Sequence, residues 1–383
     1  MKNDVSRIDT IFDVYDENNE NLKQQTHDRR REKQGPEIEI TGSIRAPAGR
    51  QAWKVFLRVK ANKTALFCFL AEKLVEIHSV VTLYATYKEH VLVNSHPFTD
   101  ESNGLLNTLA PCSHPEADTR IFSHIKDAVE QGHRNVLVRS VDSDIPVIGI
   151  GTFDKLSPLK ELYVEYGKSK DLEVIPVHEL VLALGPKAKA LLLFNALTGC
   201  DSTSSLIWTG KTLCWGVWDL VPDLTETLIT IQSDPLQFSL NSVHMERLER
   251  FFILLYSKTC GQMRVNKARS YLFQTSARSL DRMPPSQAAL YQHILRALLQ
   301  AGYIWAQAPI LQPFLPPFTD WGWKRSSVGH LVPFWTTLKD ASKSCKALHS
   351  CTCKTSCTRC KCVVNGFRCT SLCKCEGACA NNE

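Results

Sequence analysis

The chain has 383 residues, of which 44% are hydrophobic and 22% are charged, and its formal net charge is +6. These values are ordinary for a globular protein of about two domains, and they exclude a collagen-like or mainly disordered chain. The net charge is too small to indicate nucleic-acid binding by itself. The first residues contain no apolar signal core and no later apolar run reaches membrane-spanning length, so we expect a soluble intracellular protein.

The first 35 residues combine a short strand with a basic segment. The strand begins near Ile8 and ends at Asp13, and a polar helix with Lys23 and the cluster Arg29–Arg31 follows. Such a charge run is most often a solvated face. Residues 36–111 predict a helix and a β-hairpin without recognisable chemistry (Lys63–Glu76; Val80–Tyr84 with His90–Val93).

Two acidic pairs bracket the next helix and strand. Glu116 and Asp118 open a predicted helix whose apolar residues recur at helical spacing (Ile121, Phe122, Ile125 and Val129). An apolar strand then ends in Asp142 and Asp144. Four carboxylates in one cleft repel each other unless divalent cations neutralise them, and oxygen ligands suit Mg²⁺ or Mn²⁺. The alternative is a helix cap followed by a strand-end turn.

The order of these motifs resembles the flap-endonuclease branch of the PIN-like nuclease superfamily. It runs from a strand ending in Asp13, through Glu-Ala-Asp and Asp-x-Asp, to a Gly-Cys-Asp turn that ends at Asp201. The resemblance covers Ile8 to Trp218, with an insertion at about residues 36–111. It implies an α/β fold with a PIN-like core over residues 1–220.

The resemblance also implies roles for individual residues. Six carboxylates would hold two Mg²⁺ or Mn²⁺ ions that hydrolyse a phosphodiester (Asp13, Glu116, Asp118, Asp142, Asp144 and Asp201). Lys23 would contact the scissile phosphate, and Lys211, after a Gly-centred turn, would grip the DNA backbone.

One departure from the family pattern concerns the first strand. The family fold begins with a central strand that carries a further metal-ligand Asp, and nothing before Arg7 provides it. Either the chain is a fragment of a longer protein, or it has lost part of its sheet and one ligand. We favour the fragment, which puts the activity of this chain in doubt.

Two further regions precede the C-terminal tail. Residues 221–307 predict a helical extension that packs against the core (Val243–Ser257, Val265–Phe273 and Ser286–Trp305). Residues 308–344 predict a Pro-rich linker that contains Trp321 and Trp323, whose rings are suited to dock on a neighbouring surface.

The tail, residues 345–383, holds ten of the 15 cysteines. Nine of them follow the spacing C-x-C-x3-C-x2-C-x-C-x6-C-x3-C-x-C-x3-C (Cys351, Cys353, Cys357, Cys360, Cys362, Cys369, Cys373, Cys375 and Cys379). This density, in a chain without a secretory signal, predicts thiolate metal binding rather than disulfides. Nine thiolates serve three tetrahedral Zn²⁺ ions if three of the thiolates bridge.

The cysteine spacing resembles the tesmin/TSO1-type CXC domain, a small zinc-cluster module that binds DNA. Family members often carry Tyr before the fourth cysteine, where this chain has Arg359, a side chain that also suits a minor groove. Lys361 and other basic residues make the tail locally cationic, as phosphate contact requires. A single copy, where the family usually pairs two, predicts weak DNA binding by the tail alone.

The sequence therefore predicts a metal-dependent nuclease core joined to a zinc module that delivers it to DNA in the nucleus, with the cytoplasm as the alternative. Such a combination would suit a gene derived from a mobile element. The rival hypothesis is a non-catalytic DNA- or chromatin-binding protein that acts through the zinc module. A redox or metal-storage role for the tail is weaker, because ordered spacing beside basic residues exceeds what storage requires. Substrate structure, base preference and oligomeric state are not predicted.

Overall fold

The computed structural model describes most of the chain and divides it into two units, Met1–Phe334 and Trp335–Glu383. The described residues are 5–14, 22, 36–38, 40, 47–94, 108–114, 116–168, 171–206, 209–276, 282–327, 329–336, 350–354, 357–364 and 367–382. Lys23 and the Arg29–Arg31 cluster lie outside these ranges, so their predicted roles have no structural counterpart here. Each unit is a separate body with its own core.

A three-stranded sheet holds the first strand of the chain. Strand β1 (Arg7–Thr10) lies parallel to β2 (Thr82–Tyr87), which forms a hairpin with β3 (His90–Val93). This hairpin is the one that the sequence predicts. Helices α2 (Gly49–Phe56) and α3 (Lys60–Val75) precede it, and α3 packs on β2 through Ala71 and Val75.

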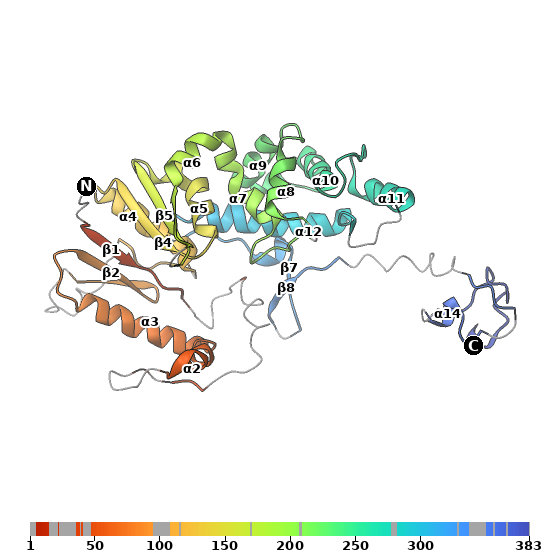
Figure 1. Cartoon of the computed structure of the whole chain (residues 1–383), viewed down its shortest axis with the longest axis horizontal. Coiled ribbons are helices and arrows are strands. Elements are labelled where there is room, and N and C mark those ends of the chain that lie inside the picture. The colour runs from red at the N-terminus through yellow and green to blue at the C-terminus, as the bar shows by residue number, and fades with distance from the viewer. Residues whose placement is uncertain are drawn as a thin grey trace. The chain divides into compact units, whose positions relative to one another are not determined.

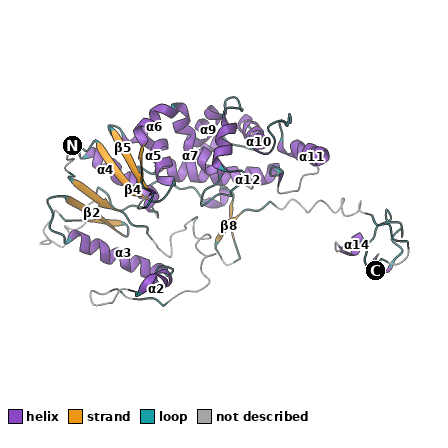
Figure 2. Cartoon of the chain, viewed as in Figure 1, coloured by secondary structure: helices purple, strands orange, loops and turns teal. Residues whose placement is uncertain are grey.

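A second three-stranded sheet follows helix α4 (Ala117–Glu130). Strand β4 (Asn135–Ser140) pairs parallel with β5 (Glu161–Tyr166), and β5 pairs antiparallel with β6 (Glu173–Pro176). Helix α5 (Asp144–Thr152) connects the two parallel strands. Figure 2 shows the strands of both sheets at one end of the first unit and the long run of later helices at the other.

Helix α4 joins the two sheets through two different stripes of side chains. Its apolar stripe (Phe122, Ile125 and Val129) packs in the same core as Val138 of β4. Its polar stripe meets β1, since Arg7 Nη1 lies 2.6 Å from Asp127 Oδ2 and His124 Nδ1 lies 2.8 Å from Asp9 Oδ1. The buried Arg7–Asp127 ion pair and the His124–Asp9 hydrogen bond fix β1 against the helix.

The rest of the first unit is helical. Its helices are α6 (Val177–Leu184), α7 (Pro186–Thr198), α8 (Lys211–Trp218), α9 (Leu224–Ser233), α10 (Val243–Tyr256), α11 (Val265–Ser276) and α12 (Gln287–Leu298). Ser242 and Ser286 cap α10 and α12, accepting backbone N–H groups with their hydroxyls. Helix α7 packs against α5, α9 and α12, and this central position explains its almost wholly apolar sequence (Figure 1).

The segment predicted as a linker is divided between the two units. Strands β7 (Trp323–Arg325) and β8 (Leu331–Pro333) form a hairpin, and Trp321 and Trp323 are buried in the core of the first unit. Burial of two indole rings removes a large apolar area from water and holds this segment on the helices. The two rings therefore dock as the sequence suggested, on the core of the first unit.

Among the described helices, no single one has the length and apolar character of a membrane span. Helices α6 and α7 reach both only when taken together, and they meet at an angle of 103°. The predicted α/β class is confirmed as a mixed α/β fold of small sheets and helices with a C-terminal cysteine cluster. Its more specific PIN-like assignment stays a prediction.

Candidate functional site

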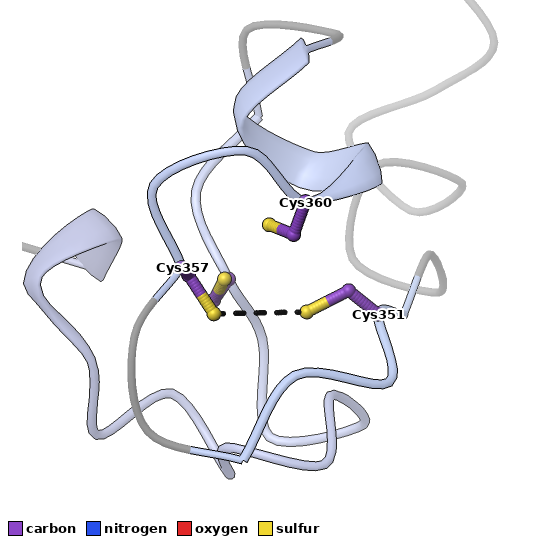
Figure 3. Close-up of side chains that lie close together, drawn as sticks. Cys351, Cys357 and Cys360 are labelled. Atoms are coloured by element: carbon purple, nitrogen blue, oxygen red, sulfur yellow. Dashed lines mark hydrogen bonds between the residues drawn. The ribbon is translucent and has the colours of Figure 1, made fainter.

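The core of the second unit consists almost entirely of cysteine side chains. Eight cysteines are buried there, and the apolar residues packed against them are Val363 and Phe367. The backbone around them is mostly irregular, with a short helix, α14 (Lys361–Val364). Figure 3 shows Cys351, Cys357 and Cys360 directing their sulfurs toward a common centre from separate turns of the chain.

The spacing of the sulfurs fits tetrahedral metal coordination. The Sγ–Sγ distance is 3.8 Å between Cys351 and Cys357, and it is 3.7 Å between Cys375 and Cys379. Four sulfurs at about 2.3 Å from a zinc ion lie about 3.8 Å from each other. A disulfide requires about 2.05 Å, and the nine described cysteines of the tail, Cys351 to Cys379, are free thiols. The cluster is therefore able to hold a metal ion such as zinc.

In three sets of four cysteines the sulfurs lie within 4.8 Å of one another, which is close enough for the set to hold a metal ion. The sets are Cys351, Cys357, Cys360 and Cys369; Cys351, Cys362, Cys369 and Cys373; and Cys357, Cys369, Cys375 and Cys379. Cys351, Cys357 and Cys369 occur in more than one set, as bridging ligands must. Cys353, the ninth predicted ligand, is half-buried and belongs to none of the three.

Hydrogen bonds to sulfur favour the thiolate form that metals bind. The backbone N–H groups of Thr370 and Cys351 donate to Cys373 Sγ at 3.3 and 3.4 Å, and they lower the pKa of Cys373 to about 6. Cys362 is fully buried, and desolvation raises its pKa to about 12. A cation bound among these sulfurs would offset that desolvation.

Two of the predicted DNA-contact residues flank one cysteine of the cluster. Arg359 and Lys361 lie on either side of the buried Cys360, and both are exposed. A rigid metal-bound turn would therefore present two cationic side chains to solvent, within one short stretch of chain.

In the first unit, Asp13 lies at the N-terminus of α4. Its Oδ1 accepts the backbone N–H of Ala117 at 2.8 Å, which places it beside Glu116 and Asp118. A carboxylate here stabilises the helix dipole. Since Arg7 contacts the third turn of the same helix, β1 runs antiparallel to α4 and delivers Asp13 to its start.

The second acidic pair forms the turn between β4 and α5. Asp142 Oδ1 accepts the backbone N–H of Asp144 at 2.8 Å, as a strand-end turn requires. Asp144 in turn accepts a hydrogen bond from Asn195 Nδ2 at 3.4 Å. Helix α7, which carries Asn195, therefore ends beside the start of α5, and the exposed Asp201 follows a few residues later.

These contacts place all six carboxylates toward one end of the first unit. Strand β4 runs back along α4 after the turn at Gly132, so its carboxyl end returns to the start of that helix. Within the described ranges, however, only the cysteine sets bring three metal-ligand atoms within 4.8 Å. Among the described residues, the carboxylates therefore lie toward one end of the first unit without forming a compact cage.

Lys211 occupies the end of α7. Its Nζ lies 2.6 Å from Asn195 Oδ1 and 2.8 Å from the carbonyl oxygen of Gly199, with Thr198 Oγ1 at 3.3 Å. An ammonium has three protons, and these acceptors suffice to engage them. Desolvation lowers the pKa of Lys211. In this structure the side chain neutralises a helix C-terminus, and its phosphate contact stays a prediction.

Sequence reasoning overlooked Asn195, which links Asp144 to Lys211. It is 6% exposed and is a polar residue within the apolar run Leu191–Leu197. A buried amide in such a run needs hydrogen-bond partners, and that was the available signal.

No protein-family model, no curated protein and no solved structure matches this chain. The site is therefore defined by its own geometry.

Proposed function

We propose that this protein binds DNA through a zinc cluster formed by its C-terminal cysteines. The observation that carries the proposal is the presence, in one buried core, of three overlapping sets of four cysteines whose sulfurs lie within 4.8 Å of one another. With three zinc ions, the shared residues Cys351, Cys357 and Cys369 would each serve two ions. Cys353 would then replace Cys369 in the first set, so that Cys369 would serve only the other two. This arrangement uses the nine cysteines as three bridging and six terminal ligands, as in the CXC domains that the tail resembles.

The DNA contact is supported by the charge around the cluster. The described part of the tail carries basic residues on its surface, against the single acid Glu376 (Lys354, Arg359, Lys361, Arg368 and Lys374). Such side chains bind phosphates, and the guanidinium of Arg359 suits a narrow minor groove. A role of this kind places the protein in the nucleus.

The zinc proposal is tested on the full chain, purified in the presence of zinc. We expect about three zinc ions per chain by elemental analysis, because four thiolates hold each ion. Cys369→Ser should release zinc and abolish duplex DNA binding measured by fluorescence anisotropy. Cys68→Ser, in α3 of the other unit, is the matched control and should change neither. A zinc content below one ion, or unchanged DNA binding by Cys369→Ser, would overturn the proposal.

We also propose that the first unit is a PIN-like, divalent-metal-dependent nuclease core. The support is that Asp13, the start of α4, the end of β4 and the end of α7 lie toward the same end of the first unit. The competing proposal is an inactive core that serves as a scaffold for the zinc module, and the absence of a compact carboxylate cage among the described residues favours it.

Cleavage assays separate these two proposals. Flapped, nicked and duplex DNA are incubated with the full chain and Mg²⁺ or Mn²⁺, beside an Asp142→Ala/Asp144→Ala variant. Cleavage that the double substitution abolishes would establish the nuclease. No cleavage of any substrate by this chain or by a version extended upstream, with zinc-dependent DNA binding intact, would favour the scaffold.

A further inference from the structure

Between Glu249 and Asp281 the sequence contains no acidic residue and six lysines or arginines. This stretch includes the end of α10, the turn after it, and α11. The C-terminal tail is cationic in the same way, whereas the chain as a whole has a net charge of only +6 over 383 residues. An acid-free cationic surface attracts polyanions and repels cations.

Helix α11 is held to the protein along one narrow stripe. Val265, Ala268 and Leu272 are its buried residues, and their spacing is that of one helix face, which packs against α10. Asn266 Oδ1 accepts the backbone N–H of Gln287 at 3.0 Å, which ties α11 to the start of α12. In Figure 1, α11 projects at the margin of the helical region.

Three of the arginines in this stretch are engaged by the protein itself. Arg264 Nη1 lies 2.9 Å from Glu249 Oε2, and Arg250 Nη1 donates to the carbonyl oxygen of Gln262 at 2.9 Å. Arg269 donates to the carbonyl oxygen of Pro284. They stabilise the turn and the helix. Among the described residues, Lys258 and Lys267 have no acidic partner and remain exposed.

The outward face of α11 combines a cation, neutral polar groups and two aromatic rings. Helical spacing places Lys267, Ser270 and Gln274 opposite the buried stripe, with Tyr271 and Phe273 on either side. Tyr271 is 44% exposed and Phe273 is 63% exposed. Exposed rings beside ammonium groups are the side chains on which unpaired bases stack while the phosphates are neutralised.

We propose that this face of α11 binds single-stranded DNA, in addition to the duplex contact assigned to the zinc cluster. This inference rests on the proposed function only in taking DNA as the partner. The rings of Tyr271 and Phe273 stack on unpaired bases. Lys267 on this face, with Lys258 in the turn before α11, contacts the phosphates, and Ser270 and Gln274 hydrogen-bond to the backbone. A paired duplex has its bases stacked internally, so it offers these rings much less contact.

The test measures binding of a fluorescent oligothymidylate to the full zinc-loaded chain by anisotropy. Removing a stacked ring costs about 1 to 3 kcal/mol per base, so Tyr271→Ser and Phe273→Ser should each weaken binding about 5- to 150-fold. Phe314→Ser, which removes another exposed ring, is the matched control and should have no effect. Lys258→Ala and Lys267→Ala should each reduce the salt slope by about 0.7.

A second arm separates this site from the zinc cluster. Cys369→Ser should keep single-strand binding and lose duplex binding, whereas Tyr271→Ser should do the reverse. The proposal is overturned if Cys369→Ser abolishes both, or if the α11 variants bind the oligothymidylate normally. It is also overturned if they alter only RNA binding or only the oligomeric state, because the face would then serve RNA or a second copy of the chain.

Discussion

The two units of this protein are stabilised by different kinds of core. The first buries large apolar side chains such as Phe122, Trp218 and Phe252, whereas the second, among its described residues, buries eight cysteines with Val363 and Phe367 packed against them. Apolar burial grows with chain length, and a unit of about 50 residues buries little apolar surface to fold by that means alone. We therefore expect the second unit, and not the first, to depend on metal cross-links for its stability.

The largest expected effect is that of removing zinc. A strong chelator should unfold the second unit, because structural zinc contributes on the order of 10 kcal/mol of folding free energy per ion. The first unit should stay folded. Limited proteolysis with mass spectrometry would show cleavage confined to residues 350–383. Simultaneous loss of both units would contradict the distinction between the two cores.

A core substitution in the first unit should destabilise that unit and leave the second unit unchanged. Phe252 is fully buried and packs edge-on against Phe251 and His293, so Phe252→Ala should lower the free energy of unfolding by about 3 to 5 kcal/mol. Urea denaturation followed by tryptophan fluorescence measures the change. Zinc content should not change, and Phe314→Ala, at an exposed ring, should be nearly neutral.

Acid should destabilise the first unit through two buried histidines. Burial lowers the pKa of His114 and of His293 to about 4, whereas both are near 6.5 in the unfolded chain. The neutral rings bond to backbone carbonyl oxygens of Ile310 and Leu197. Because the folded-state pKa is the lower one, this stability is complete above about pH 6.5 and is lost as the pH falls toward 4.

The expected loss is up to about 1.4 kcal/mol per pH unit for each histidine in that window. Urea midpoints of the first unit at several pH values measure it. His293→Gln should make the urea midpoint depend less steeply on pH. His330→Gln, an exposed control, should leave that dependence unchanged. A flat profile in the unsubstituted protein would contradict the prediction.

The smallest effect concerns the end of α7. Lys211→Met removes the cation from the last carbonyl groups of that helix and should cost about 1 to 2 kcal/mol. Lys189→Met, which breaks only an exposed pair with Asp154, should cost less than about 1 kcal/mol. Thermal unfolding of the two variants tests the difference. Equal effects would show that Lys211 is an ordinary surface lysine.

Much of the local structure followed from sequence pattern. The helix after Glu116, the β4 strand before Asp142 and the β2–β3 hairpin all occur where apolar periodicity and turn residues predicted them. Predictions were weaker where a residue's role depends on distant partners. The DNA contact of Lys211 stays a prediction, and the acceptors that its ammonium meets at the end of α7 were not foreseen; Trp321 and Trp323 were expected to dock on a neighbouring surface, and only the structure shows that this surface is the core of the first unit.

The sequence by itself indicated that the tail could bind metal, because thiols at short, regular intervals suit tetrahedral metal coordination. It also predicted several of the helices and strands, since their apolar period is local, but not α5 or the β7–β8 hairpin. Only the tertiary structure decided which cysteines are shared between sets, namely Cys351, Cys357 and Cys369. It likewise decided that the carboxylates gather at one end without forming a cage. Both depend on distances between residues far apart in the chain, which no local pattern encodes.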